Sequence, residues 1–130
     1  MKRVLKCGGI TFVSVVVFIG SPTWAQSLTN PQQNAVRSAK QYLSVQGFSR
    51  KGLIDQLSSA YGDGYSVADA TIAVDSLRND WNKEAVKSAK QYLSIQGFSC
   101  NGLIEQLSSD FGDKYTKPQA TYGAHQAGAC

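Results

Sequence analysis

An internal repeat is the feature that most constrains how this chain can fold. When the sequence is aligned with itself at an offset of 50, residues 35–59 pair with residues 85–109 and differ at only five of 25 positions. The differing pairs are Arg37/Lys87, Val45/Ile95, Arg50/Cys100, Lys51/Asn101 and Asp55/Glu105. A repeat of this length indicates one supersecondary unit used twice, and such units usually stack to share apolar surface.

Each copy has the sequence pattern of three short helices. In the first copy, apolar residues recur at helical spacing from Val36 to Leu43, and Ser49 and Ser66 are placed to cap the second and third helices. No segment of the sequence shows the strict alternation of a strand. The predicted fold is therefore all-α, with two tandem three-helix, helix-turn-helix-like repeats.

The N-terminus has the features of an export signal. Three basic residues lie within the first six positions, an apolar run follows over residues 10–20, and Thr23 and Ala25 form a T-x-A cleavage pattern. The run is about half of the ~20 residues that a membrane-spanning helix needs. We therefore expect cleavage after Ala25, a periplasmic or secreted protein and no stable membrane anchor; an uncleaved anchor is the alternative.

The predicted organisation is a signal peptide over 1–25, a flexible segment over 26–33 and repeats over 34–80 and 81–130. Loss of the signal lowers Lys+Arg from 13 to ten against nine acidic residues, so the net charge falls from +4 to +1. A nucleic-acid-binding protein keeps its basic excess in the folded part, because phosphate neutralisation supplies much of its affinity. We therefore do not expect nucleic acid as a partner.

The two copies diverge in their third helices, where the second copy has smaller or more polar residues. Val67, Val74 and Leu77 are replaced by Lys117, Ala124 and Ala127. Gly123 and Gly128 weaken this helix further, because glycine is a poor helix former. We expect this end of the chain to fray unless another interaction holds it.

A disulfide between Cys100 and Cys130 is the interaction that we predict there. These cysteines take the places of Arg50 and Asp80, two opposite charges that could pair in the first copy. Closing a loop of this length is worth roughly 3–4 kcal/mol in the chain-entropy model. The alternatives are two free thiols or a bridge between molecules.

The sequence offers little that resembles an active site or a metal site. His125 is the only histidine, so a Cys–His pair with Cys100, or a metal site with both cysteines, would have an incomplete set of ligands. Asp63 and Asp113 fall in turns, where aspartate is favoured for local backbone bonding. We predict a monomeric, non-enzymatic protein with no catalytic residues, metal or cofactor.

Charge is distributed unevenly over the predicted helices, with basic residues on the first helix of each copy and acidic residues on the other two. The predicted partner-binding acidic face consists of Asp55, Asp63, Asp69, Asp75, Glu105, Asp110 and Asp113. The third element of a DNA-reading helix-turn-helix would meet phosphates, so acidic residues there argue against DNA. The remaining interpretations are a face that steers a basic protein partner and an ordinary solvated surface.

A resemblance to a known family covers about residues 34–126. Both copies contain A-V-[RK]-S-A-K-Q-Y-L-S-x-Q-G-F-S-x-x-G-L-I-[DE]-Q-L, and the first copy continues with A-T-I-A-V-D-S-L and D-W-N. This combination closely resembles the Ltp-type host cell surface-exposed lipoprotein repeat. Members of that family carry two such modules outside the cell membrane. Some are encoded by temperate phages and act in superinfection exclusion by engaging the tape measure protein of the incoming tail.

The resemblance implies an exported binding module that blocks DNA injection by a superinfecting phage, with the tape measure protein or another basic protein as partner. The chain departs from the lipoprotein members because it has no lipobox, and its last helix lacks A-V-D-S-L. Its signal suits a Gram-negative host, in whose periplasm a soluble protein could intercept the tail. The alternative function is a bacterial cell-envelope protein-interaction module with no role against phages.

Overall fold

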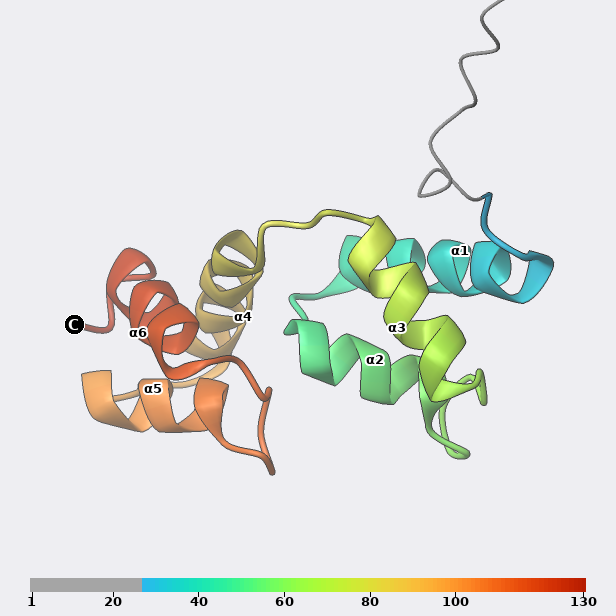
Figure 1. Cartoon of the computed structure of the whole chain (residues 1–130). Helices are drawn as coiled ribbons and strands as arrows, with labels where there is room; N and C mark the ends of the chain where they lie inside the picture. The colour runs from blue at the N-terminus through green and yellow to red at the C-terminus, as the bar shows by residue number, and fades with distance from the viewer. Residues whose placement is uncertain (1–26) are drawn as a thin grey trace, which may run out of the picture.

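The computed structural model describes residues 27–130, which form two bundles of three helices each (Figure 1). The helices are α1 (Asn30–Val45), α2 (Arg50–Ser58), α3 (Val67–Ser76), α4 (Trp81–Ile95), α5 (Cys100–Ser108) and α6 (Lys117–Gln126). The described part of the chain contains no strand, which confirms the all-α prediction of two tandem helical repeats. The predicted signal peptide and its cleavage site after Ala25 lie outside the described residues.

Hydroxyl side chains cap the helices where the sequence predicts them. Ser49 accepts a hydrogen bond from the Gly52 amide at 2.9 Å, and Ser66 accepts one from the Asp69 amide at 3.1 Å. Each cap satisfies one of the amides that have no partner within the first turn of a helix. Both helices therefore begin at the residue after the predicted cap.

The first helix begins earlier than predicted, because residues 30–33, which fall in the predicted flexible segment 26–33, form its first turn. Thr29 and Gln32 form a reciprocal capping box, in which Gln32 accepts from the Thr29 amide at 3.1 Å. Pro31 lies in the first turn, where its missing amide proton costs no helical hydrogen bond. The Gln32 side chain also donates to Asp69 at 3.0 Å, which ties the start of α1 to α3.

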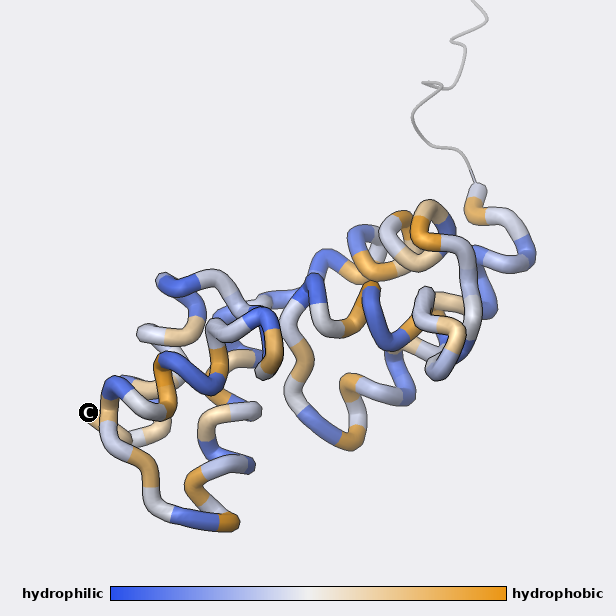
Figure 2. The backbone as a smooth tube through the Cα atoms, turned by 90° about the horizontal axis from the view of Figure 1, so that it is seen from below, coloured by the Kyte–Doolittle hydropathy of each residue, from blue (hydrophilic) through white to orange (hydrophobic). Residues whose placement is uncertain are grey.

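Each repeat has a separate apolar core. Apolar and polar residues alternate along the helices in Figure 2, as expected for short helices that bury one face. The buried core residues are Ala39, Leu53, Ile54, Leu57, Ala70 and Val74 in the first repeat and Ala85, Ala89, Leu103, Ile104, Leu107, Tyr115, Ala120 and Ala124 in the second. Many of these residues are alanines, which let the first and third helices of a repeat approach closely.

The link between the repeats is short and packed. Asp80 caps α4, where its carboxylate accepts from the amides of Asn82 and Lys83 at 3.0 and 3.3 Å. Trp81, the first residue of α4, packs against the core of the first repeat. The second repeat therefore starts with a side chain anchored in the first, which limits how far the two bundles can swing apart.

Candidate functional site

The two repeats meet along a seam that contains a groove of about 350 Å³. Residues of α2 line one side of the groove, and residues 112–114 from the turn between α5 and α6 line another. The Ser49 hydroxyl, buried at the start of α2, donates to the backbone carbonyl of Asp113. Ser49 therefore caps its own helix and holds the second repeat against it.

Ion pairs and glycine packing complete the seam. Lys51 pairs with Asp110 at 2.9 Å, and Lys114 pairs with Asp55. Gly47 lies so close to α4 that an added Cβ would come within 2.6 Å of the Glu84 carbonyl oxygen. The Gly47 amide also donates to the Gln91 side chain at 3.0 Å. The seam is therefore a specific contact between the end of α1 and the side of α4, which only a residue without a side chain permits.

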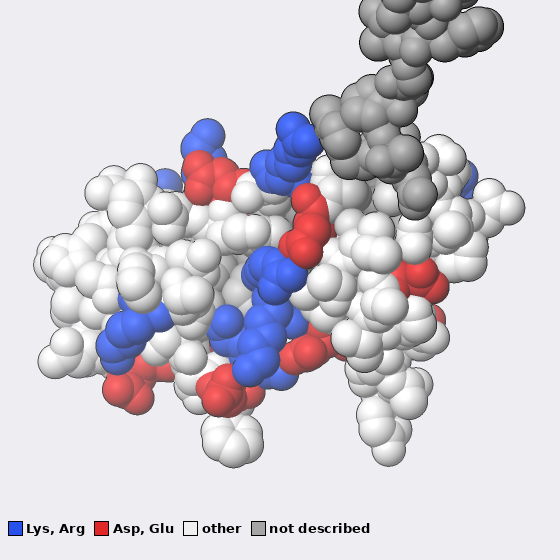
Figure 3. Space-filling view, in the orientation of Figure 1, with Lys and Arg blue, Asp and Glu red and all other residues white. Residues whose placement is uncertain are grey.

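The seven carboxylates of the predicted acidic face lie in small groups rather than on one surface. On the face that Figure 3 presents, acidic side chains are scattered and lie beside basic ones. The structure brings Asp55, Asp110 and Asp113 together at the seam. The other four lie apart from the seam: Asp63 follows α2, Asp69 and Asp75 are on α3, and Glu105 is on α5.

Four of the seven carboxylates have a cationic partner within the chain. Besides the two seam pairs, Arg50 donates twice to Asp75 at 2.6 and 2.8 Å, and Glu105 lies 3.8 Å from Lys117. Hydrogen bonding from Arg50 lowers the pKa of Asp75, and hydrogen bonding from Lys51 lowers the pKa of Asp110. The charge of these carboxylates is largely balanced before any partner arrives.

The other three carboxylates accept hydrogen bonds from neutral groups, so their negative charge is not balanced locally. Tyr42 donates to Asp63 and Tyr92 donates to Asp113, both at 2.8 Å. Asp69 accepts from the Gln32 amide group. Burial raises the pKa of Asp113, and the hydrogen bond from Tyr92 partly opposes that shift.

The two tyrosines are functional-site residues that the sequence analysis did not single out. Each lies 21 residues before the aspartate that it holds, in both copies of the repeat, and this matched spacing is the signal that could have revealed them. Gln56 and Gln106 donate to the same tyrosine hydroxyls at 3.3 and 3.1 Å. The hydroxyls are thereby oriented towards the carboxylates.

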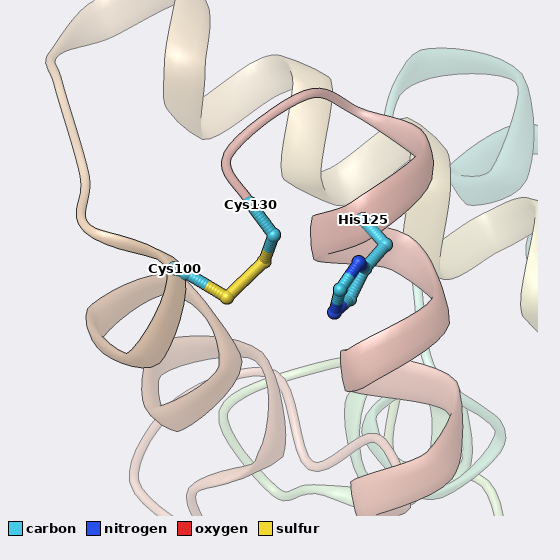
Figure 4. A group of neighbouring side chains, drawn as sticks. All are labelled: Cys100, His125 and Cys130. Atoms are coloured by element: carbon cyan, nitrogen blue, oxygen red, sulfur yellow. A yellow bond between two sulfur atoms is a disulfide. The ribbon is translucent and has the colours of Figure 1, made fainter.

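The predicted disulfide between Cys100 and Cys130 is present, with 4.6 Å between the two Cα atoms. His125 lies beside it (Figure 4), so three residues with metal-binding side chains gather at this end of the second repeat. Zinc is held by cysteine thiolates, whereas these sulfur atoms are bonded to each other. The oxidised cluster is therefore a structural bridge.

The expected pairing of Arg50 with Asp80 is wrong. Arg50 pairs with Asp75 instead, and Asp80 is occupied as the cap of α4. Asp75 is the repeat equivalent of His125, so the second repeat has Cys100 and His125 where the first has an ion pair. The bridge thus replaces the Arg50–Asp75 contact as the link between the second and third helices of the repeat.

Comparisons with known proteins agree on one family. Residues 30–77 and 80–126 both match the family described as host cell surface-exposed lipoprotein, Lipoprotein_Ltp. The structure of Ltp, a superinfection exclusion protein from the Streptococcus thermophilus temperate phage TP-J34, is similar to this chain with a TM-score of 0.68 and 34% identity. That match covers 76% of this chain and 97% of the other. No curated protein sequence matches significantly. None of the helices in the described part of the chain has the length and apolarity needed to cross a membrane.

Proposed function

Since this chain belongs to the family of host cell surface-exposed lipoproteins, we propose that it acts in superinfection exclusion, outside the cytoplasm and without catalysis. The observation that carries this proposal is the similarity to an exclusion protein over 97% of that protein's chain, at 34% identity. The similarity includes both repeats, so the whole two-bundle unit and not a single helix pair is what the two proteins share.

The proposed action is to block DNA injection by an incoming phage through binding a basic protein of its tail, with the tape measure protein as the expected partner. Three carboxylates support an electrostatic contribution, since Asp63, Asp69 and Asp113 are held by neutral donors and keep their negative charge. Such charges speed the encounter with a basic partner and help to orient it. The four ion-paired carboxylates contribute less, because a partner must first displace their lysines or arginine.

The proposed location follows from the predicted signal peptide. Cleavage after Ala25 would release a periplasmic or secreted monomer with no stable membrane anchor. Cell fractionation with N-terminal sequencing of the exported protein tests this. An unprocessed chain in the cytosolic fraction would contradict the proposed site of action.

Phage challenge of cells that express the chain tests the function. The wild-type chain should lower the plating efficiency of a sensitive phage while adsorption stays normal. Asp63→Asn with Asp69→Asn should weaken protection, because these substitutions keep the side-chain shape and remove two unbalanced charges. Lys40→Gln with Lys90→Gln is the matched control, since both lysines are exposed at equivalent positions of the first helices.

The outcomes separate the proposed function from its alternatives. Normal plating of every phage tested on cells that export folded wild-type protein would favour a cell-envelope interaction module instead. Equal loss of protection in the acidic and basic double variants would show that the carboxylates have no special role.

A further inference from the structure

Two aromatic side chains of the described residues are fully exposed, and they occupy the same position in the two repeats. They are Tyr61, in the turn between α2 and α3, and Phe111, in the turn between α5 and α6. An isolated exposed aromatic residue on a protein surface needs no explanation. Here the aromatic character is kept in both copies although the preceding residue changes from Ala60 to Asp110. Since neither ring is buried, core packing does not account for it.

The turns that carry these rings are held firmly and in the same way. The Tyr61 amide donates to the Ser59 hydroxyl at 3.1 Å, and the Phe111 amide donates to Ser109 at the same distance. The glycine that follows each ring lies against the backbone carbonyl of a glutamine in the preceding helix, where no Cβ would fit. The backbone therefore presents each ring to solvent in a defined position.

The two rings belong to one side of the molecule and flank the groove at the seam. In Figure 1 both turns project from the lower side of the protein. Tyr61 lines the groove together with Gly112, the residue after Phe111. A single elongated partner segment could therefore lie along the groove and touch both rings.

Carboxylates lie next to each ring, which determines the chemistry of the partner. Asp63 is two residues after Tyr61, and Asp110 immediately precedes Phe111. An aromatic face attracts a lysine or arginine cation, and a neighbouring carboxylate balances its charge. The ion pair of Asp110 with Lys51 is exposed, so a partner's cation can exchange with it at little cost.

We propose that Tyr61 and Phe111 form a two-point docking surface for a basic protein segment, whose lysine or arginine side chains stack on the two rings. This inference rests on the proposed function, because it names the contact that a basic tail protein would make. An anionic lipid surface fits less well, since carboxylates beside both rings would repel its headgroups.

Binding of defined synthetic probes tests the docking surface directly. The purified wild-type chain should bind a labelled 20-residue peptide of Lys, Ala and Leu, and should not bind the peptide with Glu in place of every Lys. Tyr61→Ser with Phe111→Ser should weaken binding at least about tenfold. Val45→Ser with Ile95→Ser is the matched control, because these residues are also apolar, repeat-equivalent and 75 and 81% exposed. The control should bind within about twofold of wild type.

Folding and lipid binding are checked with the same proteins. Both ring positions are fully exposed, so circular dichroism and thermal midpoints of the ring variant should match wild type. Loss of binding to phosphatidylglycerol vesicles in the ring variant, with peptide binding unchanged, would overturn the proposal in favour of a membrane contact. Equal weakening of peptide binding in the control would also overturn it.

Phage challenge separates this inference from the proposed function. If wild-type and ring-variant cells are protected equally, the docking surface is wrong and the function survives. If wild-type cells are not protected but peptide binding depends on both rings, the function is wrong and the basic-segment docking surface survives.

Discussion

The two repeats have nearly identical first and second helices but hold their third helices in different ways. In the first repeat, Val74 is buried in the core, and Leu77 and Trp81 pack against it. In the second repeat, Tyr115 is buried and shares a hydrogen bond of 2.8 Å with Ser88. The disulfide then fixes the end of the chain to the start of α5. The difference teaches that the third helix adapts to its neighbour: the first continues into α4, and the second is closed by a bridge.

A second contrast concerns residues that are identical in sequence. Gly47 and Gly97 both follow the first helix of their repeat, but an added Cβ would collide with α4 at Gly47 and meet open space at Gly97. The seam exists on one side of each repeat only, so the same glycine has a packing role in one copy and none in the other.

Removal of the disulfide should have the largest effect and should be confined to one repeat. Cys100→Ser with Cys130→Ser opens a loop with a sequence separation of 30, which costs roughly 3–4 kcal/mol of unfolding free energy. Hydrogen exchange should show α5 and α6 losing protection while α1 and α2 keep theirs. Equal loss in both repeats would mean that the bundles unfold as one unit.

The close packing of α6 on α4 gives the next largest effect. Gly123→Ala should lower the free energy of unfolding by about 1–3 kcal/mol, because the new Cβ would approach the Ala85 carbonyl. Thermal denaturation of this variant beside Gly128→Ala measures the effect of position. Gly128 has open space but a positive φ of 89°, so its cost comes from backbone strain alone. If Gly123→Ala is neutral, the close approach of the two helices is wrong.

The seam glycine gives a smaller, local effect. Gly47→Ala should cost about 1–2 kcal/mol or open the seam, whereas Gly97→Ala should stay within about 0.5 kcal/mol of wild type. Amide chemical shifts of Gln91 and Ser88 report on the seam, since both residues lie against Gly47. Unchanged shifts in Gly47→Ala would contradict the seam packing.

The ion pair of the first repeat should have the smallest effect. Asp75→Asn should cost at most about 1 kcal/mol at neutral pH, because Arg50 and Asp75 are both about half exposed and solvent screens the pair. Arg50 lowers the pKa of Asp75 in the folded protein, so the pair stabilises above the unfolded pKa and loses its contribution as pH falls through the folded pKa. Urea denaturation across this acidic range should show wild type and variant converging. A constant difference would contradict an electrostatic origin.

Much of the fold could be predicted because its signals are local. The repeat, the helical spacing and the caps at Ser49 and Ser66 all depend on residues within a few positions of each other. The capping box of Thr29 and Gln32 was equally local, and reading the polar segment as flexible missed it. The disulfide could be predicted because the offset of the repeat relates Cys100 to Arg50.

The groove and the partners of the carboxylates could not be predicted, because they depend on how two bundles meet. Lys114 reaches Asp55 across 59 positions of sequence, a pairing for which periodicity gives no signal. The two meanings of Gly47 and Gly97 likewise follow from tertiary contact alone. Composition correctly identified acidic residues, but it could not separate those that are balanced from those that are free to attract a partner.

Entry of phage DNA into protected cells is the measurement that tests the proposed function most directly. Cells that export the wild-type chain are mixed with a challenging phage, and adsorbed particles and phage DNA inside the cells are counted separately. The account predicts normal adsorption with little or no DNA inside. Normal amounts of phage DNA inside cells that contain the exported, folded protein would contradict it.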